Sequence, residues 1–240
     1  MEMKVVVNVD DYCLTKSQID GTIFAYQHGV VTSTSCLVTQ RDELLEYGAL
    51  KSQENPGLGV GLHLTLTLGE CLTKGKTICK PDGTFYKQND VDWDNLDEEE
   101  IYQEFKAQME RFIKFFGRKP DHIDSHHKTF GICDFSNIRH IDRRIADEYG
   151  IKDIRGASKN IIYLGSPYGH FNYESFTKLI DDAMDTGMEY IEIGCHAAFV
   201  DEELFEKSSY NYQRIQELKV LTSQEVLDYY KANNIIKATY

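Results

Sequence analysis

The sequence lacks any long hydrophobic run. No apolar stretch approaches the roughly 20 residues that a membrane-spanning helix needs, so we expect no membrane partner. The apolar stretch nearest the start of the chain covers only residues 5–9 and leads directly into Asp10 and Asp11, a pattern unlike that of a secretory signal. We therefore expect a cytoplasmic protein.

Closely spaced cysteine pairs are also missing. The six cysteines are scattered, and none belongs to a CxxC motif. This spacing gives little support to a zinc–cysteine cluster. Reduced, mostly buried thiols are the simpler interpretation, and they agree with a cytoplasmic location.

Basic residues are few relative to acidic ones. Lysine and arginine number 26 and aspartate and glutamate 39, which gives a net charge of −13. A chain this acidic repels a phosphate backbone, so we expect no nucleic-acid partner. With 240 residues, 41% of them hydrophobic and 27% charged, the chain is globular rather than disordered or coiled-coil. We expect a single domain over residues 1–240, with one irregular insert.

Short β-branched segments alternate with longer helical patterns. We predict strands at 4–9, 32–38, 58–66, 122–126, 153–157, 190–196 and 235–239. We predict helices at 15–28, 42–53, 96–116, 137–149, 171–186 and 223–232, and partial helix over 202–221. Residues 69–93, rich in glycine and turn signals, are the expected insert. The alternation predicts right-handed βαβ units and a parallel sheet, and their number favours a (β/α) barrel over an open sheet.

Polar residues gather where the predicted strands end. In a parallel barrel the carboxyl ends of the strands meet at one rim, where catalytic groups lie. Four predicted strands carry candidate metal ligands at or near that end: Asp10, Asp11, His63, Asp124, His126, His127 and His196. Taken together, two or three histidines and an aspartate favour a site for one divalent metal ion.

Each of these residues also has a plainer interpretation. Asp10 and Asp11 could simply cap the helix that follows them. His63, inside an apolar strand, could be a hydrogen-bonded core histidine, and the DSHH segment could be a surface patch. Exposed aromatic side chains near the rim could stack on sugar rings, although most of the 15 tyrosines are expected in the core.

The motifs resemble those of one known family. In order along the chain they are NVDDYCLT, GLHLTLTLG, GRKPDHIDSHH and CHAAFVD, spanning residues 8–201. The sequence resembles the YdjC-like carbohydrate deacetylases, which include the chitooligosaccharide deacetylases. The resemblance implies a deformed (β/α) barrel, TIM-like with fewer or irregular strands. It also implies hydrolysis of an N-acetyl group from an amino sugar in a short chitin-type oligosaccharide.

The resemblance also implies roles for particular residues. Asp11, His63 and His126 take the positions of the metal ligands, and Asp10 that of the general base. His196 takes the position of a general acid. We expect one divalent ion, Mg²⁺ or Zn²⁺ first and Mn²⁺ or Co²⁺ next, to polarise the amide carbonyl and lower the pKa of bound water.

Residues around the implied ligands would support them. Asp124 would orient a ligand histidine or His196 through the second ring nitrogen, and His127 would lie beside the ligands.

The sequence departs from the family pattern at the histidine run. Lys128 and Phe130 stand where close relatives have histidines, and Ala197 replaces a proline. These departures put the substrate in doubt more than the metal. Lys128 and Arg155 could lie near the rim and bind an anion, which would suit a phosphorylated oligosaccharide, or each could make an ion pair at the surface.

Two other functions remain open. The chain could be another mononuclear or binuclear metal hydrolase or isomerase acting on a sugar or sugar phosphate, or a non-catalytic sugar-binding relative. A binuclear site usually needs more carboxylate ligands. The sequence does not specify the oligomeric state, and a homodimer is the assembly we expect by analogy with compact cytoplasmic enzymes of this type.

Overall fold

The computed structural model describes residues 2–127 and 139–240. Within them the strands are β1 (Lys4–Tyr12), β2 (Ser33–Cys36), β3 (Gly59–Leu64), β4 (His122–Ser125), β5 (Asp153–Ile154), β6 (Ile162–Tyr163), β7 (Tyr190–Cys195) and β8 (Ile236–Lys237). The α-helices are α1 (Lys16–His28), α2 (Asp42–Glu54), α3 (Glu98–Phe116), α4 (Arg139–Tyr149), α5 (Tyr173–Asp185), α6 (Glu202–Lys207), α7 (Tyr212–Leu221) and α8 (Gln224–Ala232). Two short 3₁₀ helices, η1 (Gln88–Asp90) and η2 (Trp93–Asn95), lie before α3.

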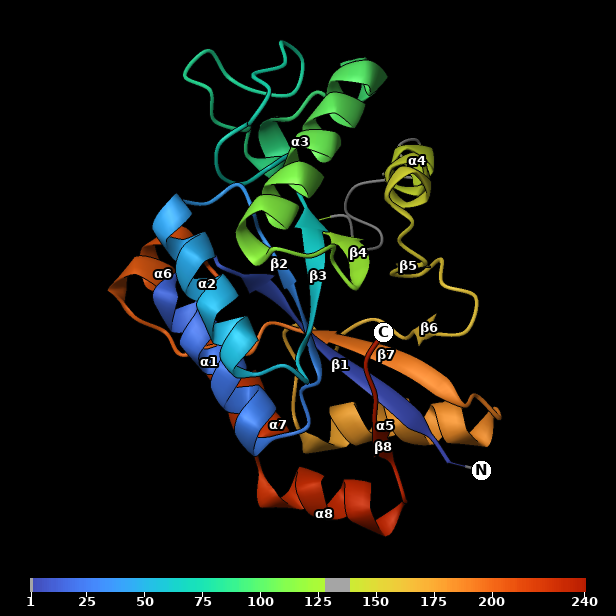
Figure 1. The fold of residues 1–240 in the computed structure, drawn as a ribbon. Helices are drawn as coiled ribbons and strands as arrows, with labels where there is room; N and C mark the ends of the chain where they lie inside the picture. The colour runs from blue at the N-terminus through green and yellow to red at the C-terminus, as the bar shows by residue number, and fades with distance from the viewer. Residues whose placement is uncertain (1, 128–138) are drawn as a thin grey trace.

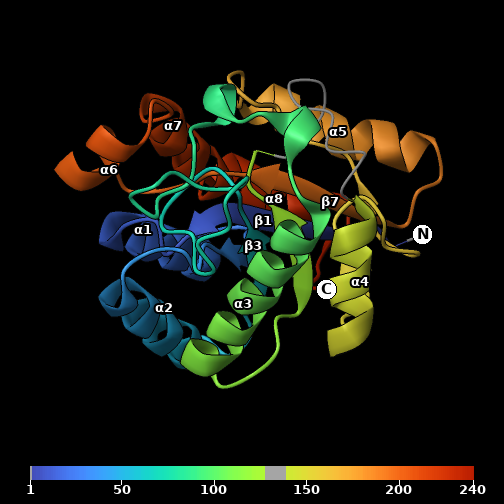
Figure 2. The ribbon, with the colours of Figure 1, turned by 90° about the horizontal axis from the view of Figure 1, so that it is seen from above.

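All the paired strands run parallel. Their order is β5-β4-β3-β2-β1-β7-β6, and β8 pairs with the start of β1. The two ends of this path, β5 and β6, do not pair with each other within the described residues, so the sheet is a barrel left open along one side. Helices flank it, with α1, α2 and α3 near one another and α5 and α8 under β1 and β7 (Figures 1 and 2). The prediction of a deformed (β/α) barrel with a parallel sheet is confirmed.

Most predicted elements lie where the sequence patterns place them. β1 runs three residues further than the predicted strand 4–9, and β5 and β8 are only two residues long. The start of the predicted helix 137–149 falls outside the described residues. Strand β6 was missed because a two-residue strand is too short to give a periodic signal.

The core explains why β1 is apolar throughout. Val5, Val7 and Val9 pack into a cluster with β7, α5 and α8, while Tyr12 and Cys13 belong to a second cluster with β2, β3 and α3. Because β1 is buried on both faces, its sequence does not alternate between apolar and polar residues. Asp10 and Asp11, near the end of β1, are therefore buried as well.

The irregular segment 65–97 is tied to α3. Glu100 accepts hydrogen bonds from the backbone and hydroxyl of Thr77 at 2.7 Å each, and Glu104 accepts from the backbone of Thr73 at 2.9 Å. The two carboxylates are four residues apart and so lie on the same helix face. Figures 1 and 2 place this segment above the carboxyl ends of β2 and β3.

Two further expectations concern cysteines and membranes. The five cysteines within the described residues are buried and free, and Cys133 lies outside those residues. No helix in the described part of the chain is both long and apolar enough to cross a bilayer.

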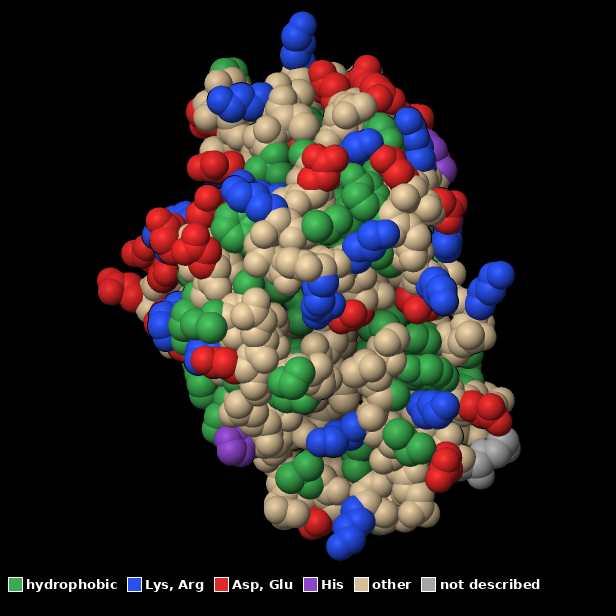
Figure 3. Space-filling view, viewed as in Figure 1, with side chains coloured by type: hydrophobic (Ala, Val, Ile, Leu, Met, Phe, Trp, Pro, Cys, Tyr) green, Lys and Arg blue, Asp and Glu red, His purple; other side chains and the backbone are tan. Residues whose placement is uncertain are grey.

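On the face drawn in Figure 3, basic side chains are interspersed with acidic ones rather than gathered into a stripe.

Candidate metal centre

A bulge at the end of β1 places two consecutive carboxylates in one site. The β1–β2 register shifts between Val9 and Tyr12, and Asp11 has a left-handed backbone with φ of 67°. In a regular strand Asp10 and Asp11 would point to opposite faces. Here both lie near His63, and they are only 6% and 1% exposed.

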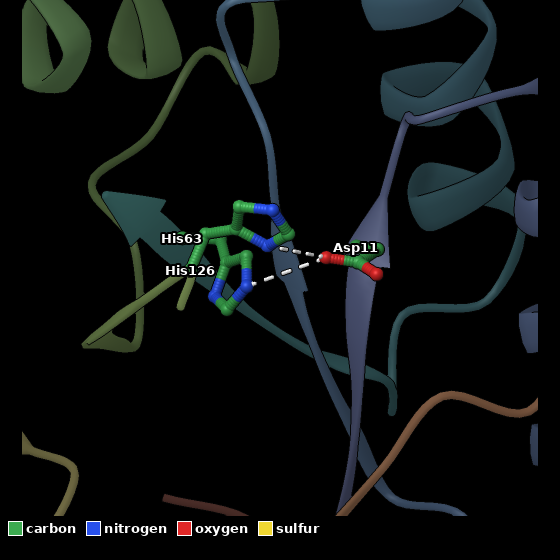
Figure 4. A group of neighbouring side chains, drawn as sticks. All are labelled: Asp11, His63 and His126. Atoms are coloured by element: carbon green, nitrogen blue, oxygen red, sulfur yellow. Dashed lines mark ion pairs between the residues drawn. The ribbon is translucent and has the colours of Figure 1, made fainter. Parts of the chain in front are cut away.

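Asp11 faces two histidines from neighbouring strands (Figure 4). His63 in β3 brings its Nε2 to 3.5 Å from Asp11 Oδ1, and His126, just after β4, brings its Nδ1 to 3.0 Å from the same oxygen. The ligand atoms of all three lie within 4.8 Å of one another. Oxygen and imidazole nitrogen donors at this spacing are suited to one divalent transition-metal ion.

Two features of the donor atoms fit a metal. Asp11 Oδ1 is buried and has no hydrogen-bond partner of acceptable geometry among the described residues, although two ring nitrogens approach it. His63 Nδ1 lies 2.7 Å from Asp124 Oδ1 and 3.3 Å from the Ser35 hydroxyl. When the proton sits on Nδ1 and is donated to Asp124, Nε2 is unprotonated and its lone pair, facing Asp11, can bind a metal ion. Asp124 thus contacts the predicted ligand His63.

The other oxygen of Asp11 is held by an arginine from the far end of the chain. Arg214 in α7, 3% exposed, donates to Asp11 Oδ2 at 2.6 Å and to the side-chain oxygen of Gln18 at 2.9 Å. It also reaches the backbone carbonyl of His196 at 3.4 Å. Burial opposes ionisation of Asp11, but His126 and Arg214 outweigh it and hold the pKa of this carboxyl well below its usual range.

Asp10 is held in a different way. Arg155, which directly follows β5, donates to both of its oxygens at 2.8 Å. The same guanidinium donates to Glu192 Oε1 at 2.6 Å and lies 2.9 Å from Asp124 Oδ2. Arg155 is only 8% exposed. The expectation that Arg155 binds an anionic substrate is therefore wrong, because three protein carboxylates occupy its donors.

Arg155 and, next to Asp124, His63 determine the electrostatics of this interior cluster. Burial alone would raise the pKa of the Asp10 carboxyl, but Arg155 outweighs burial and holds that pKa below its usual range. The pKa of Asp124 is lowered as well, by Arg155 and His63 against the effect of burial. Burial raises the pKa of Glu192. Without a metal, the neighbouring carboxylates overcome burial and raise the pKa of His63 to about 10.

A second group of candidate donors, Asp10, His63 and Asp124, also lies within 4.8 Å. Arg155 already contacts both of its carboxylates. Arg155 occupies both oxygens of Asp10, whereas Arg214 occupies only Oδ2 of Asp11 and leaves Oδ1 available, so the Asp11 group is the better candidate metal site.

His196 follows β7 on the opposite side of Asp11. Its backbone N–H donates to the carboxylate of Glu217, which also accepts from the Tyr210 hydroxyl at 2.6 Å. The imidazole lies edge-on to Tyr210 and Tyr168, with ring centroids 5.4 and 5.7 Å away. Its Nδ1 has no hydrogen-bond partner within the described residues.

The remaining predicted residues follow β4. His127 packs on His126 with centroids 3.7 Å apart, and its Nδ1 lies 2.9 Å from the Thr67 hydroxyl. Burial and the neighbouring His126 lower the pKa of His127 to about 3. Lys128 and Phe130 lie outside the described residues.

Sequence reasoning missed the contribution of α7. Arg214 and Glu217 are three residues apart, which places them on one helix face, and both are buried with Leu218 and Leu221. A charged pair on an otherwise apolar face was the only signal in the sequence, and such pairs are also common on solvated helices.

Comparisons with known proteins identify the family. A family model described as "YdjC-like protein" matches residues 4–232. A relative from Listeria innocua serovar 6a, named carbohydrate deacetylase 2, is 34% identical over 99% of this chain and 98% of its own length. The chitooligosaccharide deacetylase of Salmonella typhi is 36% identical over 93% of this chain and 92% of its own length.

Two solved structures share the fold of this chain. A protein of Enterococcus faecalis V583, described as a cellobiose-phosphate cleavage protein, superposes with a TM-score of 0.90 at 31% identity, covering 100% of this chain and 98% of that one. A peptidoglycan N-acetylglucosamine deacetylase has a TM-score of 0.51 at 10% identity, covering 98% of this chain and 85% of that one. The second likeness concerns the fold alone.

Proposed function

This chain belongs to the YdjC-like protein family, and from that premise we propose that it is a metal-dependent carbohydrate deacetylase. It would remove N-acetyl groups from amino sugars in short, chitobiose-type oligosaccharides during carbohydrate catabolism. The names of the relatives from Listeria and Salmonella support the reaction class. The observation that carries the proposal is the buried Asp11 oxygen between two histidine nitrogens, one residue from a carboxylate clamped by arginine.

Asp11, His63 and His126 would hold the ion. A divalent metal bound there would polarise the amide carbonyl and lower the pKa of a bound water. Of the two ions expected first, two imidazoles and one carboxylate favour zinc over magnesium, which prefers oxygen ligands. Arg214 keeps the second oxygen of Asp11 engaged, which favours ligation through one oxygen only.

Asp10 would act as the general base. Its lowered pKa keeps it ionised at neutral pH, and Arg155 fixes the plane of the carboxylate. A carboxylate has about four lone-pair sites, so it can accept a proton from water while it accepts hydrogen bonds from Arg155. The arginine weakens the base but orients it, and orientation is a large part of proton-transfer catalysis.

His196 would act as the general acid. It follows the strand next to β1, and its backbone is anchored by Glu217 and Arg214. Since Arg214 also holds Asp11, one side chain fixes the spacing between the metal ligand and the acid. Protonated His196 would pass a proton to the departing amine nitrogen.

The form of the substrate is a separate question. Arg155 is unavailable for a phosphate, since its donors are engaged inside the site. We therefore propose the unphosphorylated disaccharide as the better substrate, and the 6-phosphate as the comparison.

Four further expectations stay predictions: a cytoplasmic location, a homodimer, a single domain with an insert, and a supporting role for His127.

The test is acetate release from N,N′-diacetylchitobiose and its 6-phosphate. Metal-stripped protein would receive Mg²⁺, Mn²⁺, Co²⁺ or Zn²⁺, beside the variant Asp10→Asn. We expect metal-dependent release, and a fall in kcat of about 10²–10⁴-fold in the variant, the usual contribution of a general base. Metal affinity of Asp10→Asn, measured by calorimetry, should stay near that of the wild type.

Three outcomes would contradict the proposal. Protein that binds one ion per chain yet releases acetate from no N-acetylated sugar is not this deacetylase. Two ions per chain would favour the binuclear hydrolase or isomerase. Absence of metal binding would favour the non-catalytic sugar-binding relative.

A further inference from the structure

Tyr168 presents an exposed aromatic ring beside the candidate general acid. It lies in the connection between β6 and α5 and is 59% exposed. A single exposed tyrosine is ordinary on a protein surface. What sets Tyr168 apart is that its ring is held in place and borders the site.

The ring of Tyr168 is stacked on that of Tyr210. The two centroids are 4.2 Å apart and the planes differ by 12°. Tyr210 is 7% exposed, and its hydroxyl donates to Glu217 at 2.6 Å and accepts from the backbone of Gly169 at 3.0 Å. One face of Tyr168 is therefore covered by a fixed neighbour, and its large exposed area belongs to the other side.

The backbone around Tyr168 is fastened on both sides. The carbonyl of Gly165 accepts from the backbone of Gly194 in β7 at 3.0 Å. After the tyrosine, Gly169 is bound to the Tyr210 hydroxyl, and Ser175 at the start of α5 donates to the carbonyl of His170 at 2.8 Å. Little conformational freedom would be lost when a ligand meets this ring, which is the condition for a pre-organised contact.

The Tyr168 ring lies next to His196, the candidate general acid. The imidazole of His196 lies edge-on to the Tyr168 ring at 5.7 Å and 75°. A group that receives a proton from His196 must lie close to this ring.

We propose that Tyr168 is a sugar-binding platform, which stacks against the apolar face of the pyranose ring next to the scissile amide. This inference rests on the proposed function, because it names the substrate contact of the same site. Tyrosine provides a rigid, flat and amphipathic surface with few rotatable bonds, well suited to this contact. Tyr168 would thus determine affinity for the oligosaccharide, whereas His196 and Asp10 perform the chemistry.

The experiment compares three substitutions at one position. Tyr168→Phe keeps the ring, Tyr168→Leu keeps apolar bulk without a flat face, and Tyr168→Ala removes both. KM and kcat for N,N′-diacetylchitobiose would be measured for each, together with metal affinity and binding of the disaccharide by ligand-observed NMR. We expect KM to rise about tenfold in the Ala and Leu variants, the size of a typical aromatic contact. The value of kcat and metal affinity should stay within about twofold, and Tyr168→Phe should resemble the wild type.

The outcomes separate this inference from the function on which it rests. Active wild type with unchanged KM in Tyr168→Ala would overturn the platform and leave the deacetylase intact. A loss of metal affinity or of kcat alone would mean that Tyr168 only supports the fold of the site, which also overturns it. Should the wild type prove inactive, binding decides: disaccharide bound by wild type and Tyr168→Phe but not by Tyr168→Ala supports the platform. No binding by the wild type refutes it.

Discussion

Asp10 and Asp11 are adjacent in sequence, yet they belong to two differently built regions. On the interior side, Asp10, Asp124 and Glu192 share the guanidinium of Arg155. On the rim side, Arg214 pairs with Asp11 alone, and the second oxygen of Asp11 faces two histidines. In the interior, three carboxylates share one arginine. At the rim, one oxygen of Asp11 and the nearby histidine nitrogens remain available to bind a metal.

The difference separates a cluster that depends on one arginine from a group that can bind a metal. A buried carboxylate without a cation is costly, so the interior cluster depends on Arg155. At the rim, ring nitrogens of His63 and His126 approach the free oxygen of Asp11 and could bind a metal with it. We therefore expect loss of Arg155 in the interior to reduce stability, and changes at the rim to reduce metal affinity.

The largest expected effect is that of Arg155→Leu. It leaves Asp10, Asp124 and Glu192 buried without their shared cation, and breaking a buried ion pair costs about 3–5 kcal/mol. We expect a loss of this order in the free energy of unfolding, measured with urea on metal-free protein.

Lys178→Leu is the matched control for that substitution. Lys178 pairs with Asp182 on the exposed surface of α5 at 2.8 Å, where water screens the pair, so its loss should hardly change the free energy of unfolding. A loss below about 1 kcal/mol in Arg155→Leu would show that the interior cluster does not depend on its arginine.

His122 predicts how the interior responds to acid. Its ring is fully buried against Tyr240, with centroids 3.8 Å apart, and burial lowers its pKa to about 4 although Asp124 acts in the opposite direction. The unfolded chain takes up this proton near pH 6.5 and the folded chain only near pH 4. The free energy of unfolding should therefore fall as pH drops from about 6.5 to 4, by up to about 3 kcal/mol from this group.

The variant His122→Phe isolates that contribution. It keeps an aromatic ring against Tyr240 and has no proton to gain, so its stability should fall less between pH 6.5 and 4. His127, whose pKa is also lowered, makes the free energy of unfolding fall with pH in both wild type and His122→Phe. Its contribution is therefore removed when the two pH profiles are subtracted. Parallel pH profiles for the two proteins, in excess chelator, would refute the assignment.

At the rim, Arg214→Gln should weaken metal binding with a smaller effect on folding. Asp11 loses the partner of Oδ2 but keeps His63 and His126 beside Oδ1. Outer partners of metal ligands usually contribute 10–100-fold in affinity or activity, and we expect a metal Kd weaker by about that factor.

Calorimetry with Zn²⁺ or Mn²⁺ measures the effect of Arg214→Gln, and Arg144→Gln on the surface of α4 is the control. An unchanged or tighter Kd would mean that repulsion between arginine and metal outweighs the orientation of Asp11.

The strand order and the family resemblance together selected the candidate metal ligands. Because parallel strands bring their carboxyl ends together, the sequence pattern grouped several polar residues at one rim, and the resemblance to the YdjC-like deacetylases then selected Asp11, His63 and His126 among them. The fold class followed from the same alternation of strands and helices.

The arginine partners could not be predicted in the same way. Arg155 is 145 residues from Asp10, and Arg214 is 203 residues from Asp11. Which arginine meets which carboxylate depends on the lengths of the connections and on how far the open barrel closes. The incorrect expectation for Arg155 arose because the sequence did not show that its side chain is buried among three carboxylates.

The left-handed backbone at Asp11 has a consequence for what this position accepts. Among residues with a side chain, aspartate and asparagine adopt that conformation with the least strain, and glycine adopts it freely. Only aspartate also offers a charged oxygen to two histidines. At residue 11, the shape of the chain and the chemistry of the site thus select the same amino acid. A glutamate is equally charged, but it adopts the left-handed conformation less readily, and its longer side chain would move the carboxylate.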